Sequence, residues 1–173
     1  MSGPGRLRGS GCADADMLKR LDEYYLNMPA GEVFGLKELN PVEYAMFEAA
    51  GVKMILPGEK MYHGRNILLA GAVWKTVLGT TGGRIYRIAA QTMTPEKDVS
   101  EKVFGAVYGS LSEEMGPGAG GPAQRYLIWD TPEGNVILEM CRAEESFVVQ
   151  ICLTSSFIKL AARKSGVDCI NSN

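Results

Sequence analysis

The stretch 136-VILEMCRAEESFVVQICLT-154 decides the fold, because its two halves predict a β-hairpin with one self-consistent register. An even-length turn over 143–146 brings the large apolar side chains of both strands onto one face. The apolar pairs are then Met140 with Val149, Leu138 with Ile151 and Val136 with Leu153, while Glu139 pairs with Gln150 on the other face. A one-residue slip would mix the two faces, so this register is a specific prediction.

Three segments outside this hairpin also have the pattern of strands. Residues 124–130 precede it and are joined to it by a turn at 130–135, which completes a three-stranded meander. Upstream, 67–78 and 84–91 are rich in β-branched and aromatic residues, and the glycine-rich stretch between them predicts a second hairpin. Gly71 interrupts 67–78 and indicates a bulge or a bend.

Helical periodicity is strongest over 95–115, where large apolar residues recur every four positions from Val99 to Met115. Two more helices are expected in the N-terminal part. The first runs from an N-cap at Asp14 or Asp16 to Met28.

The second N-terminal helix has a clearer start signal. Asn40 is a good N-cap, Pro41 suits the first helical position, and Glu43 completes a capping-box pattern. A short strand over 52–56 and a last helix over 157–164 are also expected.

These elements together indicate an α+β domain with a single antiparallel sheet of five to six strands. The sheet combines the two-stranded hairpin with the three-stranded meander, and the 95–115 helix packs on one of its faces. We expect a flexible tail over 1–13, one domain over 14–164 and a frayed tail over 165–173. Within that domain, 14–56 is the N-terminal helical part and 67–164 holds the sheet and its helices.

The composition is that of an ordinary globular chain, and it excludes several classes of protein. Of 173 residues, 46% are hydrophobic and 22% are charged, with a net charge of −2. Neither wholesale disorder nor general nucleic-acid binding is therefore expected. No apolar run approaches the ~20 residues of a membrane-spanning helix, so we expect a soluble, cytoplasmic protein.

Groups able to bind a metal or a cofactor are few. The chain has one histidine and four cysteines, without a C-x-x-C pair. In the predicted register Cys141 faces Val148 and Cys152 faces Ile137, so these cysteines are not disulfide partners. The G-x-G-x-x-G at 116–121 follows a helix rather than a strand, which is the wrong context for a dinucleotide. We expect no metal and no cofactor.

Two residues are catalytic candidates. His63 lies in the loop Tyr62-His63-Gly64-Arg65 before the first hairpin, where it could act as a general base. Ser155 lies between the last strand and the last predicted helix, where its hydroxyl could meet a helix N-terminus. A pocket near His63 would make the chain a small-ligand-binding domain or a hydrolase.

Two candidate surfaces for a partner stand out in the sequence. The first is a local concentration of basic residues that could meet an anion or an acidic partner: Arg65, Lys75, Arg84 and Arg87, with Trp74 nearby. The second is one face of the first predicted helix, which could be core or contact: Met17, Leu21, Tyr24 and Met28.

The scarcity of reactive groups favours a non-enzymatic protein-binding module, and the layout of helices and strands resembles small bacterial secretion-chaperone-like or adaptor domains. Such a module could also self-associate, since a free sheet edge can pair with its own copy. A small-ligand-binding domain or hydrolase is the alternative. In a third hypothesis, 1–11 replaces a leader and Cys12, after Ser10-Gly11, anchors a domain of the cell envelope.

Overall fold

The computed structural model describes residues 20–33, 35–43, 58–120, 125–132 and 134–155. Along the chain, the elements are β1 (Arg20–Leu21), β2 (Tyr24–Tyr25), the 3₁₀ turn η1 (Ala30–Glu32), β3 (Lys37–Glu38), β4 (Lys60–His63), β5 (Ile67–Leu69), β6 (Ala72–Thr81), β7 (Arg84–Thr94), α2 (Lys97–Met115), β8 (Tyr126–Thr131), β9 (Gly134–Ala143) and β10 (Ser146–Ser155). None of the helices in these ranges combines the length and the apolar character needed to cross a membrane.

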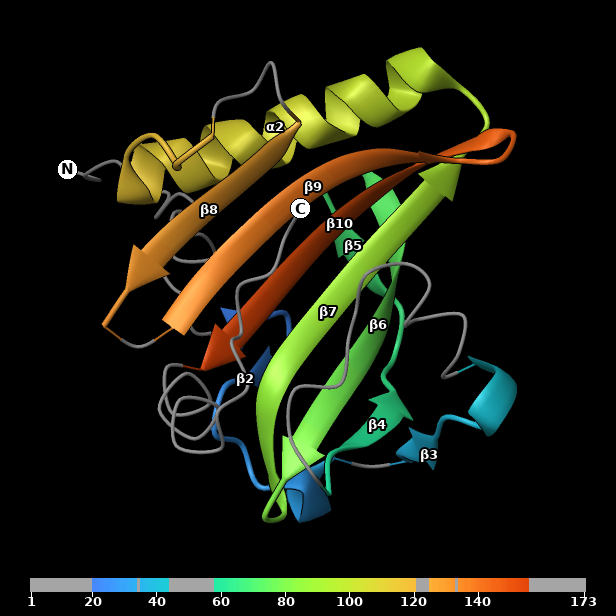
Figure 1. The fold of residues 1–173 in the computed structure, drawn as a ribbon, viewed down its shortest axis with the longest axis vertical. Coiled ribbons are helices and arrows are strands. Elements are labelled where there is room, and N and C mark those ends of the chain that lie inside the picture. The colour runs from blue at the N-terminus through green and yellow to red at the C-terminus, as the bar shows by residue number, and fades with distance from the viewer. Residues whose placement is uncertain (1–19, 34, 44–57, 121–124, 133, 156–173) are drawn as a thin grey trace, which may run out of the picture.

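The main sheet is antiparallel and has eight strands, in the order β3-β4-β6-β7-β10-β9-β8, with β5 paired to β6 beside this path (Figure 1). The α+β class and the single large antiparallel sheet are confirmed. The prediction of five to six strands is wrong, because short strands before residue 70 extend the sheet and because β1 and β2 form a second, two-stranded sheet.

The β9–β10 hairpin has the predicted register at every pair. Met140 lies opposite Val149, Leu138 opposite Ile151, and Val136 opposite Leu153. All six side chains are buried in the main core. The meander is also confirmed, since β8 pairs with β9 over Tyr126–Thr131.

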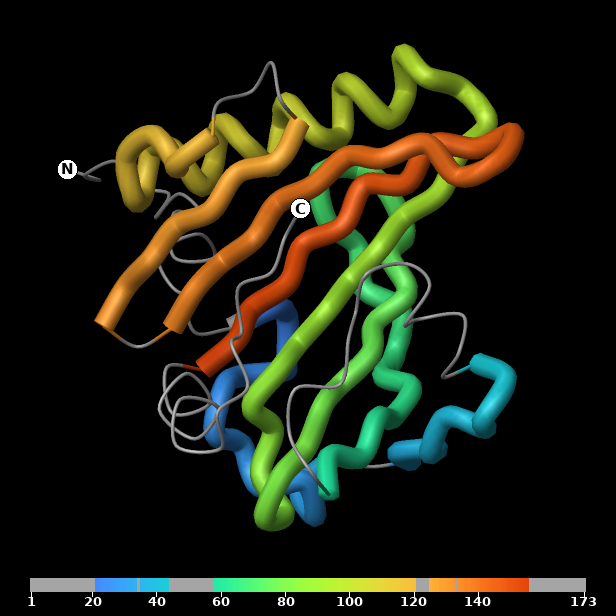
Figure 2. Tube along the Cα trace, in the orientation of Figure 1, coloured from blue at the N-terminus to red at the C-terminus, as the bar shows by residue number. Residues whose placement is uncertain are grey.

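The helix α2 lies across one face of the sheet and packs against β7, β9 and β10 (Figure 2). Its buried face consists of Ser100, Val103, Phe104, Val107 and Leu111. The side chain of Thr94 accepts a hydrogen bond from the nitrogen of Glu96, so it closes the turn that leads into the helix. The predicted helix over 95–115 is thus confirmed, with its first helical residue at Lys97.

The first predicted N-terminal helix is wrong over its described part, which is the β1–β2 hairpin. Leu21 and Tyr24 are paired across a tight turn and both are buried in the core. Two residues three positions apart lie on one face of a helix. Two residues that flank a two-residue turn are also three positions apart, and they lie on one face of a hairpin. Asp22 and Asn27 decide between the two, because both adopt positive φ, which a continuous α-helix does not contain.

The start of the second predicted helix has the expected capping box. Residues 41–43 are helical, and Oδ1 of Asn40 accepts hydrogen bonds from the nitrogens of Val42 and Glu43 at 3.0 and 2.9 Å. The Glu43 carboxylate in turn accepts one from the nitrogen of Asn40 at 2.9 Å. The rest of this helix, the strand over 52–56 and the helix over 157–164 lie outside the described residues.

The predicted strand over 67–78 is two strands, β5 and β6, joined by a tight turn. Leu69 pairs with Ala72, and the turn residues Ala70 and Gly71 both have positive φ. Gly71 is therefore part of a reversal rather than a bulge. β4 and β5 pair with the same edge of β6. Between them, the two residues that separate Gly64 from Ile67 lie opposite a single residue of β6, so this segment has one residue more than β6.

The glycine-rich segment after α2 packs along the edge strand β8. Ala119 exchanges two backbone hydrogen bonds with Ile128, at 2.8 and 3.0 Å, and the indole nitrogen of Trp129 donates to the carbonyl of Gly116. A Cβ at Gly118 would lie 2.8 Å from the Trp129 ring, so a side chain there would clash. The glycines of the G-x-G pattern thus serve packing and cover part of a sheet edge.

Candidate functional site

The face of the main sheet that points away from α2, the distal face, carries side chains in rows that run across the strands. The outer row consists of Leu68, Val73, Met93, Val148 and Cys141. Leu68 pairs with Val73, and Val148 pairs with both Met93 and Cys141. Val73 and Met93 lie two residues beyond the paired Lys75 and Gln91 on the same face, so they lie opposite each other on β6 and β7.

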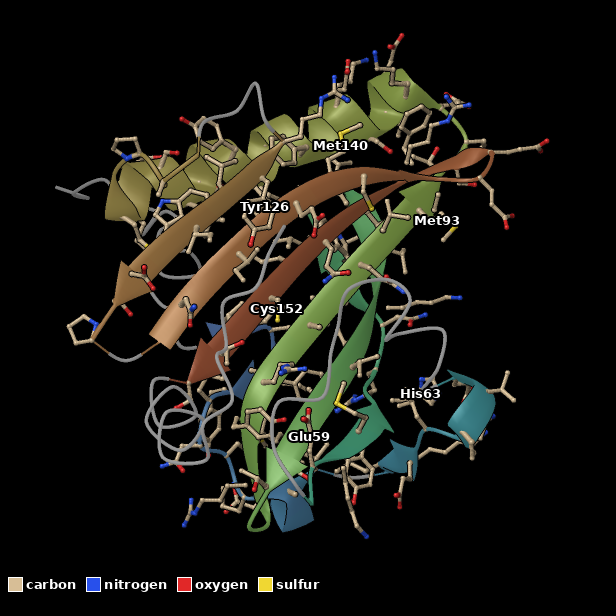
Figure 3. All side chains as sticks on the ribbon, in the orientation of Figure 1. Glu59, His63, Met93, Tyr126, Met140 and Cys152 are labelled. Carbon is tan, nitrogen blue, oxygen red and sulfur yellow. The ribbon has the colours of Figure 1, made fainter. Side chains whose placement is uncertain are left out.

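Three side chains of the outer row are among the most exposed large hydrophobic residues of the described chain, whereas Val148 in the same row is only 7% exposed. Leu68 is 75% exposed, Val73 61% and Met93 60%. Six large hydrophobic residues are exposed in the described ranges, and three of them lie in this one row. Figure 3 shows Met93 near the end of β7, far from His63 and Glu59 at the opposite end of the sheet. A concentration of this kind is typical of a contact surface rather than of scattered exposed side chains.

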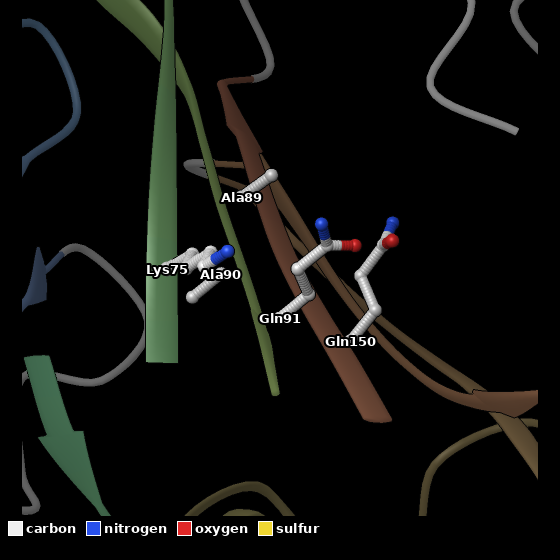
Figure 4. A pocket seen from close by; sticks show the side chains of 5 residues that line it. All are labelled: Lys75, Ala89, Ala90, Gln91 and Gln150. Atoms are coloured by element: carbon white, nitrogen blue, oxygen red, sulfur yellow. The ribbon is translucent and has the colours of Figure 1, made fainter. Parts of the chain in front are cut away.

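The next row, the glutamine row, is polar and consists of Lys75, Gln91, Gln150, Glu139 and Tyr126, each opposite the next. Lys75, Gln91 and Gln150 line a shallow depression, and the two glutamine side chains extend side by side from it (Figure 4). Their amides offer donors and acceptors to a partner. Burial raises the pKa of the Glu139 carboxyl, and burial together with Glu139 raises the pKa of the Cys141 thiol.

The remaining rows of the distal face are packed and closed. Val77 forms a small buried cluster with Leu39 and Met61. Arg87 and Glu59 form an ion pair with 3.6 Å between Nη1 and Oε1, and their side chains are only 3% and 0% exposed. Gly79 lies beside this pair and makes room for it, because a Cβ there would be 3.0 Å from the Glu59 carboxylate.

Cys152 belongs to the packed part of the distal face and is not an activated nucleophile. Its Sγ lies 3.7 Å from the hydroxyl of Thr154. Burial is the main cause that raises the pKa of the Cys152 thiol, which keeps it protonated. Cys141 and Cys152 are both free and face Val148 and Ile137 as predicted.

The two catalytic candidates lie apart. His63 donates through Nε2 to Oε1 of Glu43 over 3.1 Å, and Glu43 is the same residue that closes the capping box. This contact and the hydrogen bond from Asn40 lower the pKa of Glu43, the latter being the larger cause. Ser155 lies three strands away on β10 and shares the face of Leu153, whereas His63 shares the opposite face with Val77. The fold does not bring the two together.

The basic candidates are also dispersed. Trp74 is buried and donates its indole nitrogen to the carbonyl of Leu69, and Arg87 is buried in its ion pair. Arg65 pairs with Glu23, and Arg84 donates to the carbonyl of Asn27. Arg65, Arg84 and Lys75 are exposed, and of these Lys75 lies within the glutamine row.

The proposed partner-helix residues belong to the core instead. Leu21 and Tyr24 are buried, and Met28 packs against the same core. Met17 lies outside the described residues, as does Cys12. The stripe was therefore core rather than contact over its described part.

Sequence reasoning missed the outer row, although its signal was present. The correct β9–β10 register already placed Cys141, Glu139, Val148 and Gln150 on the face opposite the core. The step that was missing is the pairing of β7 with β10, which brings Met93 beside Val148. That contact joins two hairpins separated by α2, and no local pattern specifies it.

Within the described residues, no group of three histidine, cysteine, aspartate or glutamate side chains is placed to hold a metal ion. Comparison with known proteins gives no further indication, since no family model, curated protein or solved structure matches this chain.

Proposed function

We propose that this chain is a protein-binding module that accepts a partner protein on the outer row and the glutamine row of its distal face. The observation that carries the proposal is the alignment of Leu68, Val73 and Met93, all more exposed than buried, in one row across three strands. A polar row with two parallel glutamine side chains borders it. Apolar contacts bordered by hydrogen-bonding groups are the usual composition of protein interfaces.

The size of this surface predicts weak, reversible binding. With strands about 4.8 Å apart and rows about 7 Å apart, the two rows cover on the order of 300 Å². A standard interface buries about 800 Å² on each partner. Burial of three large side chains contributes roughly 5 kcal/mol, of which association entropy removes a large part.

A pair of matched variants tests the proposal. Val73→Asp places a charge in the outer row, and Val99→Asp places one on the exposed part of α2, where the valine is 40% exposed. The tagged full-length variants are expressed beside an untagged copy of the chain, and all recovered proteins are identified and quantified by mass spectrometry.

The expected result is a specifically bound protein whose recovery falls at least about tenfold with Val73→Asp and less than twofold with Val99→Asp. Circular dichroism and thermal melting of both variants show that each is folded. Equal recovery with Val73→Asp and the wild type, or equal loss with both variants, would overturn the proposal.

A further inference from the structure

We propose that the partner on the distal face is a second copy of this chain, related by a two-fold axis that runs parallel to the strands between β7 and β10. The inference rests on the proposed function and names its partner. Its basis is the distribution of charge along the glutamine row.

The charges of this row lie on opposite sides of its centre. Lys75 lies on β6 and Glu139 on β9, while Gln91 on β7 and Gln150 on β10 lie between them. Three strand spacings separate Lys75 from Glu139, which is about 14 Å, so the two cannot pair within one chain. Glu139 is half-buried, and the strand residues that flank it in the register, Gln150 and Tyr126, carry no positive charge.

A two-fold axis between β7 and β10 compensates both charges at once. Rotation about it places β6 of one copy over β9 of the other, so that each Lys75 faces Glu139 of the second copy. Gln91 then faces Gln150 of the second copy, and the two amides can exchange hydrogen bonds. Facing sheets lie about 10 Å apart, a gap that a lysine and a glutamate together span.

The same axis matches the outer row with itself. Val73 faces Cys141 of the second copy, so that an exposed valine meets an exposed thiol. Met93 lies over the strand position of Val148 of the second copy, whose side chain is only 7% exposed. Each pair occurs twice in the dimer, as an isologous interface requires. The strands of the two sheets run in nearly the same direction, which is a common way for sheets to pack face to face.

Charge reversal and its rescue test this arrangement by sedimentation equilibrium, with the full-length chain at concentrations up to about 500 μM. Lys75→Glu and Glu139→Lys each place like charges opposite one another and should weaken dimerisation at least about tenfold. The double variant restores both pairs and should return to within about threefold of the wild type. Lys102→Glu on α2 is the matched control, because Lys102 is exposed on the opposite side of the sheet.

Three results would overturn the inference: a wild type that stays monomeric, single variants that dimerise like the wild type, or a double variant no better than the singles. A monomeric wild type with Val73-dependent binding of a different protein would leave the proposed function intact. Dimerisation insensitive to Val73→Asp would overturn the inference, and it would contradict the proposed function too if no other protein binds in a Val73-dependent way. Melting curves of all variants establish that each compared chain is folded.

Discussion

The backbone nitrogen of Arg65 donates a hydrogen bond to the hydroxyl of Tyr24 over 2.6 Å, and this contact ties the N-terminal hairpin to the main sheet. The Arg65 carbonyl accepts a second one from the hydroxyl of Thr76, also at 2.6 Å. The Arg65 side chain adds an ion pair to Glu23. The extra residue between β4 and β5 is thus held from both sides, by β2 and by β6.

Tyr24→Phe should lower the free energy of unfolding by about 1–2 kcal/mol, because it leaves the Arg65 nitrogen without this acceptor in a partly buried site. Tyr25→Phe is the matched control, since Tyr25 is the adjacent and exposed tyrosine. Urea denaturation of both variants measures the difference. Equal stability of the two variants would contradict the role assigned to Tyr24.

Gly64 and Gly105 should respond to alanine in opposite directions. A Cβ at Gly64 would lie 2.2 Å from Oγ1 of Thr76 and 3.1 Å from the Tyr24 hydroxyl, so Gly64→Ala forces the sheet and the hairpin apart. We expect a loss of about 2 kcal/mol or more. Gly105 lies on the exposed side of α2 with nothing within 4 Å of a new Cβ, so Gly105→Ala should stabilise by up to about 1 kcal/mol.

Thermal melting of the two alanine variants shows whether each one is less stable or more stable than the wild type. A Gly64→Ala variant as stable as the wild type would show that the close approach of Gly64 to Thr76 is not required.

The buried pair of Arg87 and Glu59 should be sensitive to the loss of one partner. Arg87→Met removes the cation that pairs with the buried Glu59 carboxylate and should cost about 3–5 kcal/mol. The double variant Arg87→Met with Glu59→Leu removes both charges and should be more stable than either single variant. Chemical denaturation of the two single variants and the double variant measures the coupling energy between Arg87 and Glu59. If the double variant loses the sum of the stabilities lost by the two single variants, the coupling is contradicted.

The elements that were predictable are those whose signals are local. The β9–β10 register follows from alternation on both strands and an even turn, and α2 follows from its four-residue repeat and its flanking stop signals. The Asn40 capping box was predictable for the same reason, because all its hydrogen bonds lie within four residues.

The elements that sequence reasoning missed depend on backbone conformations or on distant partners. Ala70 adopts positive φ without being a glycine, so the reversal between β5 and β6 had only Gly71 as a signal. Leu21 and Tyr24 have a spacing that fits a helix and a tight hairpin equally well. The outer row depends on the β7–β10 pairing, which forms across the intervening α2.

The pH dependence of stability should differ in sign between Glu139 and Glu101. Burial raises the pKa of Glu139, so the folded chain keeps this proton where the unfolded chain has released it. Stability is therefore lost as pH rises from the ordinary glutamate pKa through the raised one. Glu139→Gln should remove this loss and gain stability relative to the wild type across that interval.

Glu101 provides the opposite case, because its hydrogen bond from Arg125 lowers its pKa. The stabilisation from Glu101 is present above the ordinary glutamate pKa and is lost as pH falls through the lowered value. Glu101→Gln should therefore lose stability at neutral pH and match the wild type in acid. Urea denaturation between pH 3 and 8, at protein concentrations that keep the chain monomeric, measures the free energy of unfolding of both variants. If both variants change this free energy in the same direction relative to the wild type, the opposite roles assigned to Glu139 and Glu101 are contradicted.

The central claim is that a protein, and specifically a second copy, covers the distal face, and photo-cross-linking at Met93 tests it most directly. A photoreactive amino acid replaces Met93 in the outer row, or, as the control, Val99, which is 40% exposed on α2. After illumination of cells that produce the chain, we predict a Met93 product at twice the 18.7 kDa of the chain and composed only of its peptides, and no such product from Val99. Illumination that yields no product from Met93, or equal products from both positions, would contradict the claim.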